Sequence, residues 1–183
     1  ALNADYSMVS VSGYGIISGF TNDGNKIPEQ TILQYYDKLG FSYNKFADSI
    51  TVSETEWDFE RYKPDIIVIN LGTNDMNYAT TDERKAEFED GYLDFLKKVR
   101  SLNPDSYIFQ TYGVMGTSLE ENIENVRRKY MSETGDERIT FIPLTMQDED
   151  ADGIVADWHP SPRTHSLVSQ KVTAAIKKTL GYK

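Results

Sequence analysis

Short apolar runs alternate with longer amphipathic segments along this chain. The clearest run covers residues 66–71: it is β-branched and nearly continuous, it follows Pro64, and it ends at Gly72. Such a run is typical of a parallel strand that is buried on both faces. A short candidate strand at 8–11 ends at Ser12-Gly13, and turn-like polar residues introduce two more predicted strands at 107–109 and 139–142.

Between and after these runs the apolar spacing changes to that of a helix. Residues three or four apart are apolar in four segments: 32–39, 88–99, 119–130 and 167–180. In the third segment, Ser118 is a predicted N-cap and Glu121 completes a capping box. Gly181 is expected to end the last helix, because glycine readily adopts the left-handed conformation found after helices.

Strands that alternate with helices predict a parallel sheet covered on both faces, which is a three-layer α/β/α fold. The chain has 183 residues, and no internal repeat or linker divides it, so one domain is expected. In open parallel sheets, ligands bind beyond the carboxyl ends of the strands. Functional residues are therefore expected in three loops at one edge of the sheet: 12–15, 72–75 and 157–161.

The composition of the chain disfavours or excludes several classes of function. Lys and Arg number 19 and Asp and Glu 29, so the net charge of −10 disfavours nucleic acid and anionic membranes as partners. The absence of cysteine excludes disulfides, thiol nucleophiles and iron–sulfur clusters. Histidine chemistry has two possible positions, His159 and His165, and their spacing does not suggest a metal site.

The three loops resemble the conserved blocks of the SGNH hydrolases, the GDSL-like esterases. Gly13 looks like the glycine of the second block, and Gly72-Thr73-Asn74-Asp75 fits the G-x-N-D pattern. With Asp157-Trp158-His159-Pro160-Ser161 in the same order, the chain is most similar to carbohydrate esterase family 2, which removes acetyl groups from plant-wall polysaccharides such as xylan. The resemblance spans nearly all 183 residues. It implies an SGNH (flavodoxin-like) architecture and a serine esterase that needs no metal or organic cofactor.

The resemblance also implies roles for individual residues. The Gly13 N–H and the Asn74 amide would form the oxyanion hole, and His159 would be the general base. Plainer interpretations are a turn glycine, an Asx turn and a structural histidine. Asp75 is expected to hold its loop by accepting backbone N–H bonds. His165 is predicted to be exposed or to cap a helix.

Asp157 is the candidate that orients the imidazole. The more common SGNH pattern is D-x-x-H, but Ala156 stands at that position, so a backbone carbonyl is an alternative partner. Trp158 is a candidate wall for a sugar ring, with core packing as the alternative. Tyr14 is a further candidate for substrate binding, although Tyr14 and Trp57 are more often packing residues.

The nucleophile is the missing part of the resemblance. SGNH enzymes carry their serine at the end of the first strand, ahead of the glycine block, whereas here Gly13 is close to the first residue. The serine and the opening strand are therefore expected upstream or on another chain. Residues 1–183 would then be the C-terminal part of a single SGNH esterase domain that lacks its first strand. The similar Ala47-Asp48-Ser49 follows Gly13 and opens no helical stripe, and Ser10 and Ser12 lie in the wrong block, with Ser12 expected to be packed.

The sequence thus predicts a secreted serine esterase acting on acetylated polysaccharide or oligosaccharide, with its export signal outside these residues. Two alternatives are kept. The chain could be a non-catalytic carbohydrate-binding remnant of such an esterase. A nucleotide-binding α/β domain is disfavoured, because no Gly-rich phosphate loop follows a strand.

Overall fold

The computed structural model describes residues 2–41, 45–46 and 50–182. Its centre is a parallel sheet in the order β3-β4-β5, with Ile66 opposite Tyr107 and Ile108 opposite Ile139. The three strands are β3 (Ile66–Asn70), β4 (Tyr107–Tyr112) and β5 (Ile139–Pro143). These are three of the four strands that the apolar runs predict.

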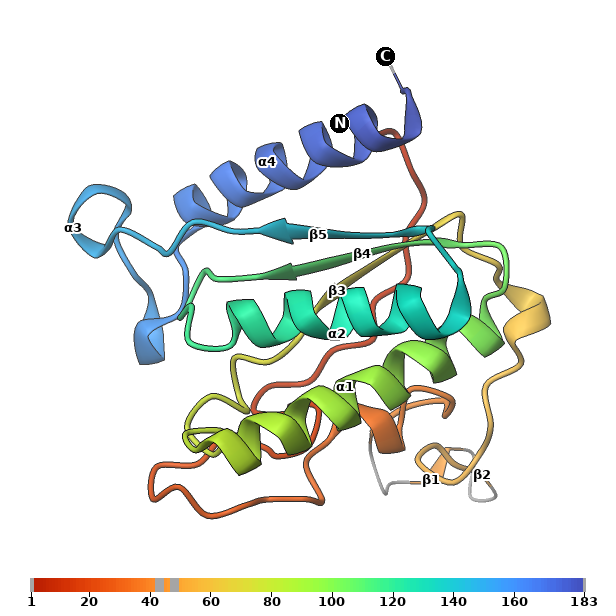
Figure 1. Cartoon of the computed structure of the whole chain (residues 1–183), viewed down its shortest axis with the longest axis horizontal. Coiled ribbons are helices and arrows are strands. Elements are labelled where there is room, and N and C mark those ends of the chain that lie inside the picture. The colour runs from red at the N-terminus through yellow and green to blue at the C-terminus, as the bar shows by residue number, and fades with distance from the viewer. Residues whose placement is uncertain (1, 42–44, 47–49, 183) are drawn as a thin grey trace.

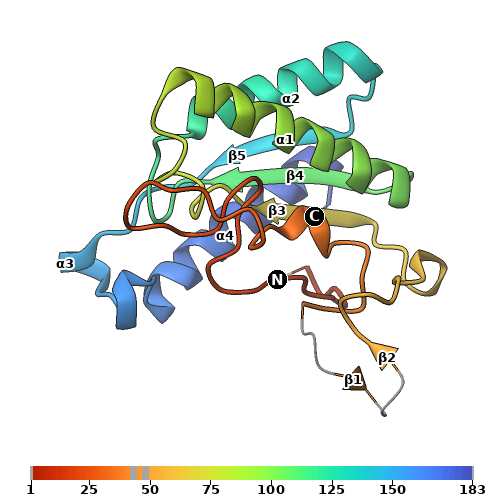
Figure 2. The ribbon, with the colours of Figure 1, turned by 90° about the horizontal axis from the view of Figure 1, so that it is seen from below.

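Helices cover both faces of this sheet. Figures 1 and 2 show α1 (Asp82–Leu102) and α2 (Glu120–Thr134) on one face and α4 (Pro162–Leu180) on the other. The short elements are η1 (Ile32–Gln34), β1 (Lys45–Phe46), β2 (Ile50–Thr51), η2 (Phe59–Arg61), α3 (Glu149–Asp152) and η3 (Ala156–Trp158). The predicted three-layer α/β/α fold is confirmed. None of the described helices is long and apolar enough to cross a membrane.

Capping residues explain where the long helices begin and end. The Thr81 side chain accepts a hydrogen bond from the third residue of α1, and the Ser161 side chain does the same for α4. Gly181 ends α4 with a φ of 71°, as predicted. The capping box predicted at Ser118 is wrong: α2 begins after Leu119, which makes no side-chain capping bond.

Two predicted elements do not form. Residues 8–11 are not a strand, and Met8 is 74% exposed. A strand needs a hydrogen-bonding neighbour, and no described strand pairs with this segment. The weak helical pattern at 32–39 yields only the three-residue η1 followed by turns.

The sheet has an open side at β3. Within the described sheet β3 pairs only with β4, and the Val68 side chain is 47% exposed. Burial on both faces, predicted for residues 66–71, is therefore wrong for β3, and it is β4 that has this property. An edge strand with an exposed apolar side chain is a surface on which another strand can pair.

Candidate active site

The carboxyl ends of β3, β4 and β5 point to one end of the molecule. Figure 1 shows α3 and η3 at this same end, on the left. The loops 72–80, 113–118 and 144–148 leave the sheet there. This is the edge at which a parallel sheet is expected to carry its ligand site.

Gly72 makes the turn out of β3 possible. Its φ is +116°, a backbone conformation that residues with side chains rarely adopt. A Cβ at this position would lie 3.3 Å from ring atoms of both Phe88 and Tyr112, which belong to the core. The first position of the G-x-N-D motif is therefore restricted by backbone geometry and by packing.

Asp75 organises the loop that follows Gly13. Its carboxylate is fully buried and accepts hydrogen bonds from the backbone N–H groups of Ile16, Ile17 and Ser18 at 2.8–3.1 Å. Burial raises the pKa of Asp75, and these N–H groups oppose part of that increase. The loop-holding role predicted for Asp75 is confirmed.

Asn74 brings the first two blocks of the motif into contact. Its Nδ2 donates a hydrogen bond of 2.7 Å to the Tyr14 carbonyl, which leaves its second N–H available. The preceding Gly13 has a φ of +81°, and its own N–H has no acceptor in the part of the chain that the structure describes. Two available N–H donors therefore lie on neighbouring segments, as an oxyanion hole requires.

The Tyr14 ring packs against two other aromatic rings. Its centroid lies 6.0 Å from that of Tyr35 and 5.5 Å from that of Phe41. This aromatic cluster favours the packing interpretation of Tyr14, whose backbone carbonyl contacts Asn74. Trp57, the other weak candidate, is 37% exposed in the segment before η2.

His159 is exposed beside η3. Its Nδ1 lies 3.1 Å from the Ala156 carbonyl, so this bond would leave Nε2 free to exchange a proton with a substrate group. Asp157 is exposed with a φ of 56°, and no described residue bonds to its carboxylate. The group beside Nδ1 is thus a backbone carbonyl, the alternative that the D-x-H spacing leaves open. His165 is exposed in the first turn of α4, as predicted.

Trp158 lies on the surface next to this histidine. Its side chain is 66% exposed, so the core-packing interpretation is wrong. The Trp158 carbonyl accepts a hydrogen bond of 2.8 Å from the side chain of Gln147, a residue that belongs to no recognised motif. The position of Gln147 just after β5 was the signal that could have identified it.

Contacts between loops connect the Asn74 segment with the His159 segment. A Cβ on Gly116, in the loop after β4, would lie 2.7 Å from the Met76 sulfur. The backbone N–H of Gln147 donates to the Val114 carbonyl in that same loop. Because Gln147 also bonds to Trp158, the loops after β3, β4 and β5 and the turn before the histidine form one connected surface.

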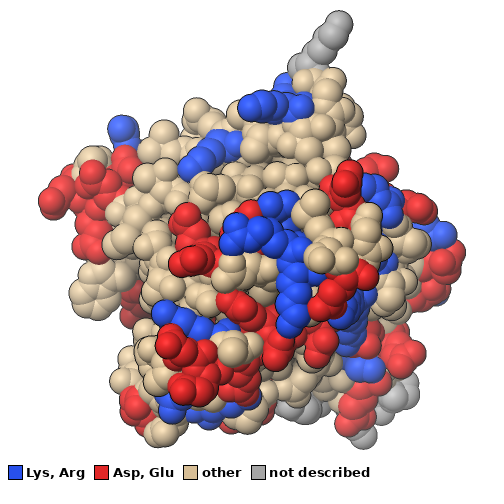
Figure 3. All heavy atoms as spheres, in the orientation of Figure 1, with Lys and Arg blue, Asp and Glu red and all other residues tan. Residues whose placement is uncertain are grey.

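The rim of this end is acidic. Figure 3 shows acidic side chains gathered over α3, where Glu149, Asp150 and Asp152 lie in the first turn. In the described part of the chain, no three His, Asp or Glu side chains are close enough together to hold a metal ion. An acidic rim of this kind suits a neutral ligand better than an anionic one.

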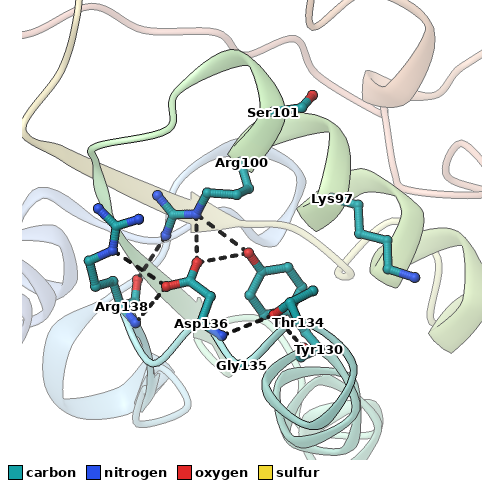
Figure 4. Close-up of a pocket in the computed structure, with 8 residues that line it drawn as sticks. All are labelled: Lys97, Arg100, Ser101, Tyr130, Thr134, Gly135, Asp136 and Arg138. Atoms are coloured by element: carbon teal, nitrogen blue, oxygen red, sulfur yellow. Dashed lines mark hydrogen bonds and ion pairs between the residues drawn. The ribbon is translucent and has the colours of Figure 1, made fainter.

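One cavity of the molecule lies elsewhere. It measures about 520 Å³ and is lined by the ends of α1 and α2 and by residues just before β5 (Figure 4). Arg100 in its wall donates to Asp136 at 2.6 Å and to four main-chain carbonyls. These guanidinium donors are already used to join α1 to the segments just before β4 and β5, so the arginine in this cavity has a structural role.

No serine nucleophile is established by this geometry. Ser12 is exposed, so the expectation that it is packed is wrong. Residues 47–49, which resemble the serine motif, lie outside the described residues. The neighbouring β1 and β2 are at the end of the molecule away from α3 (Figure 1).

Comparisons with known proteins identify the family of the chain. Residues 13–167 match the GDSL-like Lipase/Acylhydrolase family. The chain is 33% identical over 190 aligned positions to the cellulase/esterase CelE of Acetivibrio thermocellus, covering 99% of this chain and 21% of that protein. It is 23% identical to an acetylxylan esterase / glucomannan deacetylase of Cellvibrio japonicus, covering 100% of this chain and 46% of that protein.

Solved structures are similar along the same length. An acetyl xylan esterase, Est2A, from Butyrivibrio proteoclasticus superposes with a TM-score of 0.88 at 24% identity, covering 100% of this chain and 54% of that one. A family two carbohydrate esterase from Clostridium thermocellum in complex with cellohexaose has a TM-score of 0.74 at 31% identity, covering 94% of this chain and 49% of that one. The chain therefore spans about half the length, or less, of these relatives.

Proposed function

Because the chain belongs to the GDSL-like lipase/acylhydrolase family, we propose that it supplies most of the active site of a serine esterase that removes O-acetyl groups from plant-wall polysaccharide such as xylan. The expected similarity to carbohydrate esterase family 2 is confirmed, since a structure of that family matches 94% of the chain at 31% identity. The substrate class is supported by relatives described as acetylxylan esterases. A polymer of this kind does not enter cells, so we place the protein outside the cell.

The oxyanion hole consists of the Gly13 N–H and the free N–H of Asn74. Attack on an acetyl ester moves negative charge onto the carbonyl oxygen, and preorganised donors stabilise that charge. The hydrogen bond from Asn74 to the Tyr14 carbonyl keeps the amide from rotating away. The hydrogen bonds that Asp75 accepts from the backbone N–H groups of residues 16–18 hold the next part of the same loop.

His159 acts as the general base. With Nδ1 held by the Ala156 carbonyl, Nε2 accepts the proton of the attacking serine hydroxyl and returns it to the leaving sugar hydroxyl. Water activated by the same nitrogen then hydrolyses the acetyl-serine and releases acetate. In this scheme the backbone carbonyl takes the orienting role considered for Asp157.

The nucleophilic serine comes from outside these 183 residues. The support is the open side of β3, where Val68 is 47% exposed on a strand that pairs with β4 alone in the described sheet. One more parallel strand would cover it, and such a strand would end at the edge that carries Asn74. An active-site-directed fluorophosphonate should therefore label a serine outside 1–183; labelling of Ser12 would contradict this assignment.

The observation that carries the proposal is the Asn74–Tyr14 hydrogen bond, which holds a side-chain amide against the loop that carries the Gly13 N–H. The test is acetate release from acetylated xylan by the whole protein. His159→Ala should lower kcat by several orders of magnitude. His165→Ala is the matched control, since His165 is exposed on α4, and should leave kcat unchanged.

Near-full activity of the His159→Ala variant would refute the general-base assignment. Asn74→Ala should lower kcat by roughly 10²–10³, as the loss of one oxyanion donor does in other enzymes. An unchanged kcat would remove Asn74 from the oxyanion hole.

The 66% exposure of Trp158 supports a second candidate function, which is sugar binding without turnover. The same experiment separates the two functions. A binding domain would retain acetylated oligosaccharide through Trp158 but release no acetate, and the fluorophosphonate would label no serine.

A further inference from the structure

The turn in front of His159 has an unusual backbone. Asp157 and Trp158 both have positive φ values, 56° and 57°, although neither is glycine. Two such residues in succession are rare, because the left-handed conformation brings Cβ too close to the backbone. A turn of this kind persists only where surrounding contacts hold it.

Most bonds of the turn lie within the turn itself. The His159 N–H donates to the Ala156 carbonyl at 3.2 Å, and the Val155 N–H donates to the His159 carbonyl at 2.9 Å. Such bonds keep the shape of the segment but cannot keep its position relative to the sheet. Among the described residues, one hydrogen bond reaches 155–159 from outside the segment 149–161: the bond from Gln147 to the Trp158 carbonyl.

Gln147 is itself anchored to the sheet edge. Its backbone N–H donates to the Val114 carbonyl at 2.9 Å, in the loop after β4, and the residue follows β5 by four positions. Its Nε2 must be the atom that faces Trp158, because an amide oxygen there would repel the carbonyl. Among the described residues, its Oε1 is buried without a hydrogen-bond partner. A buried oxygen without a hydrogen bond lowers the stability of the fold, so stability does not explain the position of the Gln147 side chain. This points to a positional role for its Nε2 donor.

We propose that Gln147 is a positioning residue, which tethers the left-handed Asp157–Trp158 turn to the sheet edge and so places the His159 imidazole and the Trp158 indole together. This inference rests on the proposed esterase function for its kinetic consequences. The tether itself can be measured without any activity. One side chain would then set both the general base and the aromatic surface for the sugar.

The experiment compares Gln147→Met and Gln147→Glu in the whole protein. Methionine keeps the length of the side chain but cannot donate, and glutamate keeps its shape but turns a carboxylate toward the Trp158 carbonyl. Gln170→Met is the matched control, because Gln170 lies exposed on α4 and donates to the Ser166 hydroxyl on the same helix. All three variants should unfold within a few degrees of the unmodified protein.

The first readout is hydrogen exchange of the Val155 and His159 amides. In Gln147→Met the exchange should be about tenfold faster, which corresponds to about 1.4 kcal/mol of lost protection. Gln147→Glu should exchange at least as fast, and Gln170→Met at the unmodified rate. Unchanged exchange in both Gln147 variants would overturn the proposal whether or not the protein is an esterase.

The second readout is kinetic. On a small aryl acetate, Gln147→Met should lower kcat about tenfold with little change in KM, whereas on acetylated oligosaccharide KM should also rise. A stability loss that accounts for the whole activity loss, or an unmodified kcat in Gln147→Glu, would overturn the positioning role. If the unmodified protein releases no acetate, the proposed function fails, and the exchange data still decide the tether.

Discussion

Replacing Asp75 by asparagine tests the centre of the candidate site. The two side chains have the same shape, so the change alters charge and donor chemistry while filling the same volume. Oδ1 of Asp75 accepts N–H bonds from Ile16, Ile17 and Ser18, and Oδ2 lies 2.9 Å from the Ile16 nitrogen. An asparagine that keeps Oδ1 in place would turn its NH₂ group toward the Ile16 N–H, which is also a donor.

The magnitude follows from these contacts. Hydrogen bonds to a charged acceptor contribute about 1.5–3 kcal/mol, against about 1 kcal/mol for neutral ones, so three bonds lose roughly 3 kcal/mol together. The two facing donors add to this loss, and removal of a buried charge offsets part of it. We therefore expect Asp75→Asn to lower the free energy of unfolding by about 3 kcal/mol, or Tm by roughly 6–12 °C in a domain of this size.

Urea unfolding followed by circular dichroism measures this change, with Asp90→Asn as the control. Asp90 is an exposed partner of Lys129 on the surface of α1, and its substitution should change stability by less than about 0.5 kcal/mol. If Asp75→Asn lowered the free energy of unfolding as little as Asp90→Asn does, this reasoning would be refuted. It would mean that burial, which raises the pKa of Asp75, leaves the carboxyl group protonated in the folded protein.

Three further predictions concern the frame around the site. Gly72→Ala should cost roughly 2–4 kcal/mol in urea unfolding, because the new Cβ meets two core rings in a backbone conformation that alanine disfavours. Arg100→Lys should lower Tm nearly as much as Arg100→Met, because lysine cannot reproduce the guanidinium bonds to four carbonyls; full rescue by lysine would contradict this. The pKa of Asp136 lies below its ordinary value: burial raises this pKa, but hydrogen bonds from Arg138, Tyr130 and Arg100 lower it by more. The stability that Asp136 contributes is therefore full above the unfolded-state pKa of about 4 and is lost as the pH falls through the lower folded-state pKa. Unfolding of Asp136→Asn between pH 6 and 2 should lack this decline.

The regular elements of the fold were predictable because their signals are local. A β-branched run between Pro64 and Gly72 predicts β3, and Gly181 ends α4 as the last stripe predicts. The predicted strand at 8–11 failed for a non-local reason. Its apolar residues are suited to a strand, but pairing depends on a neighbour, and no described strand pairs with it.

In the candidate site, too, local signals were predictable and contacts between distant segments were not. Asn74 and Asp75 follow a strand and carry a recognisable motif, so sequence indicated them and the role of Asp75. Gln147 carries no motif, and its bond to Trp158 spans eleven residues through a turn whose φ values cannot be read from the residue types. The exposure of Trp158 was equally undetermined, since an aromatic side chain suits both a core and a sugar surface.

By itself, then, the sequence determined the α/β/α layers, the family and the edge of the sheet at which chemistry belongs, because hydrophobic period, helix caps and motif order act over a few residues. Only the tertiary structure decided which atom lies beside the His159 imidazole, that Trp158 lies on the surface, and that β3 has an open side. These features depend on contacts between segments distant in the chain, and their energies do not exist until those segments meet.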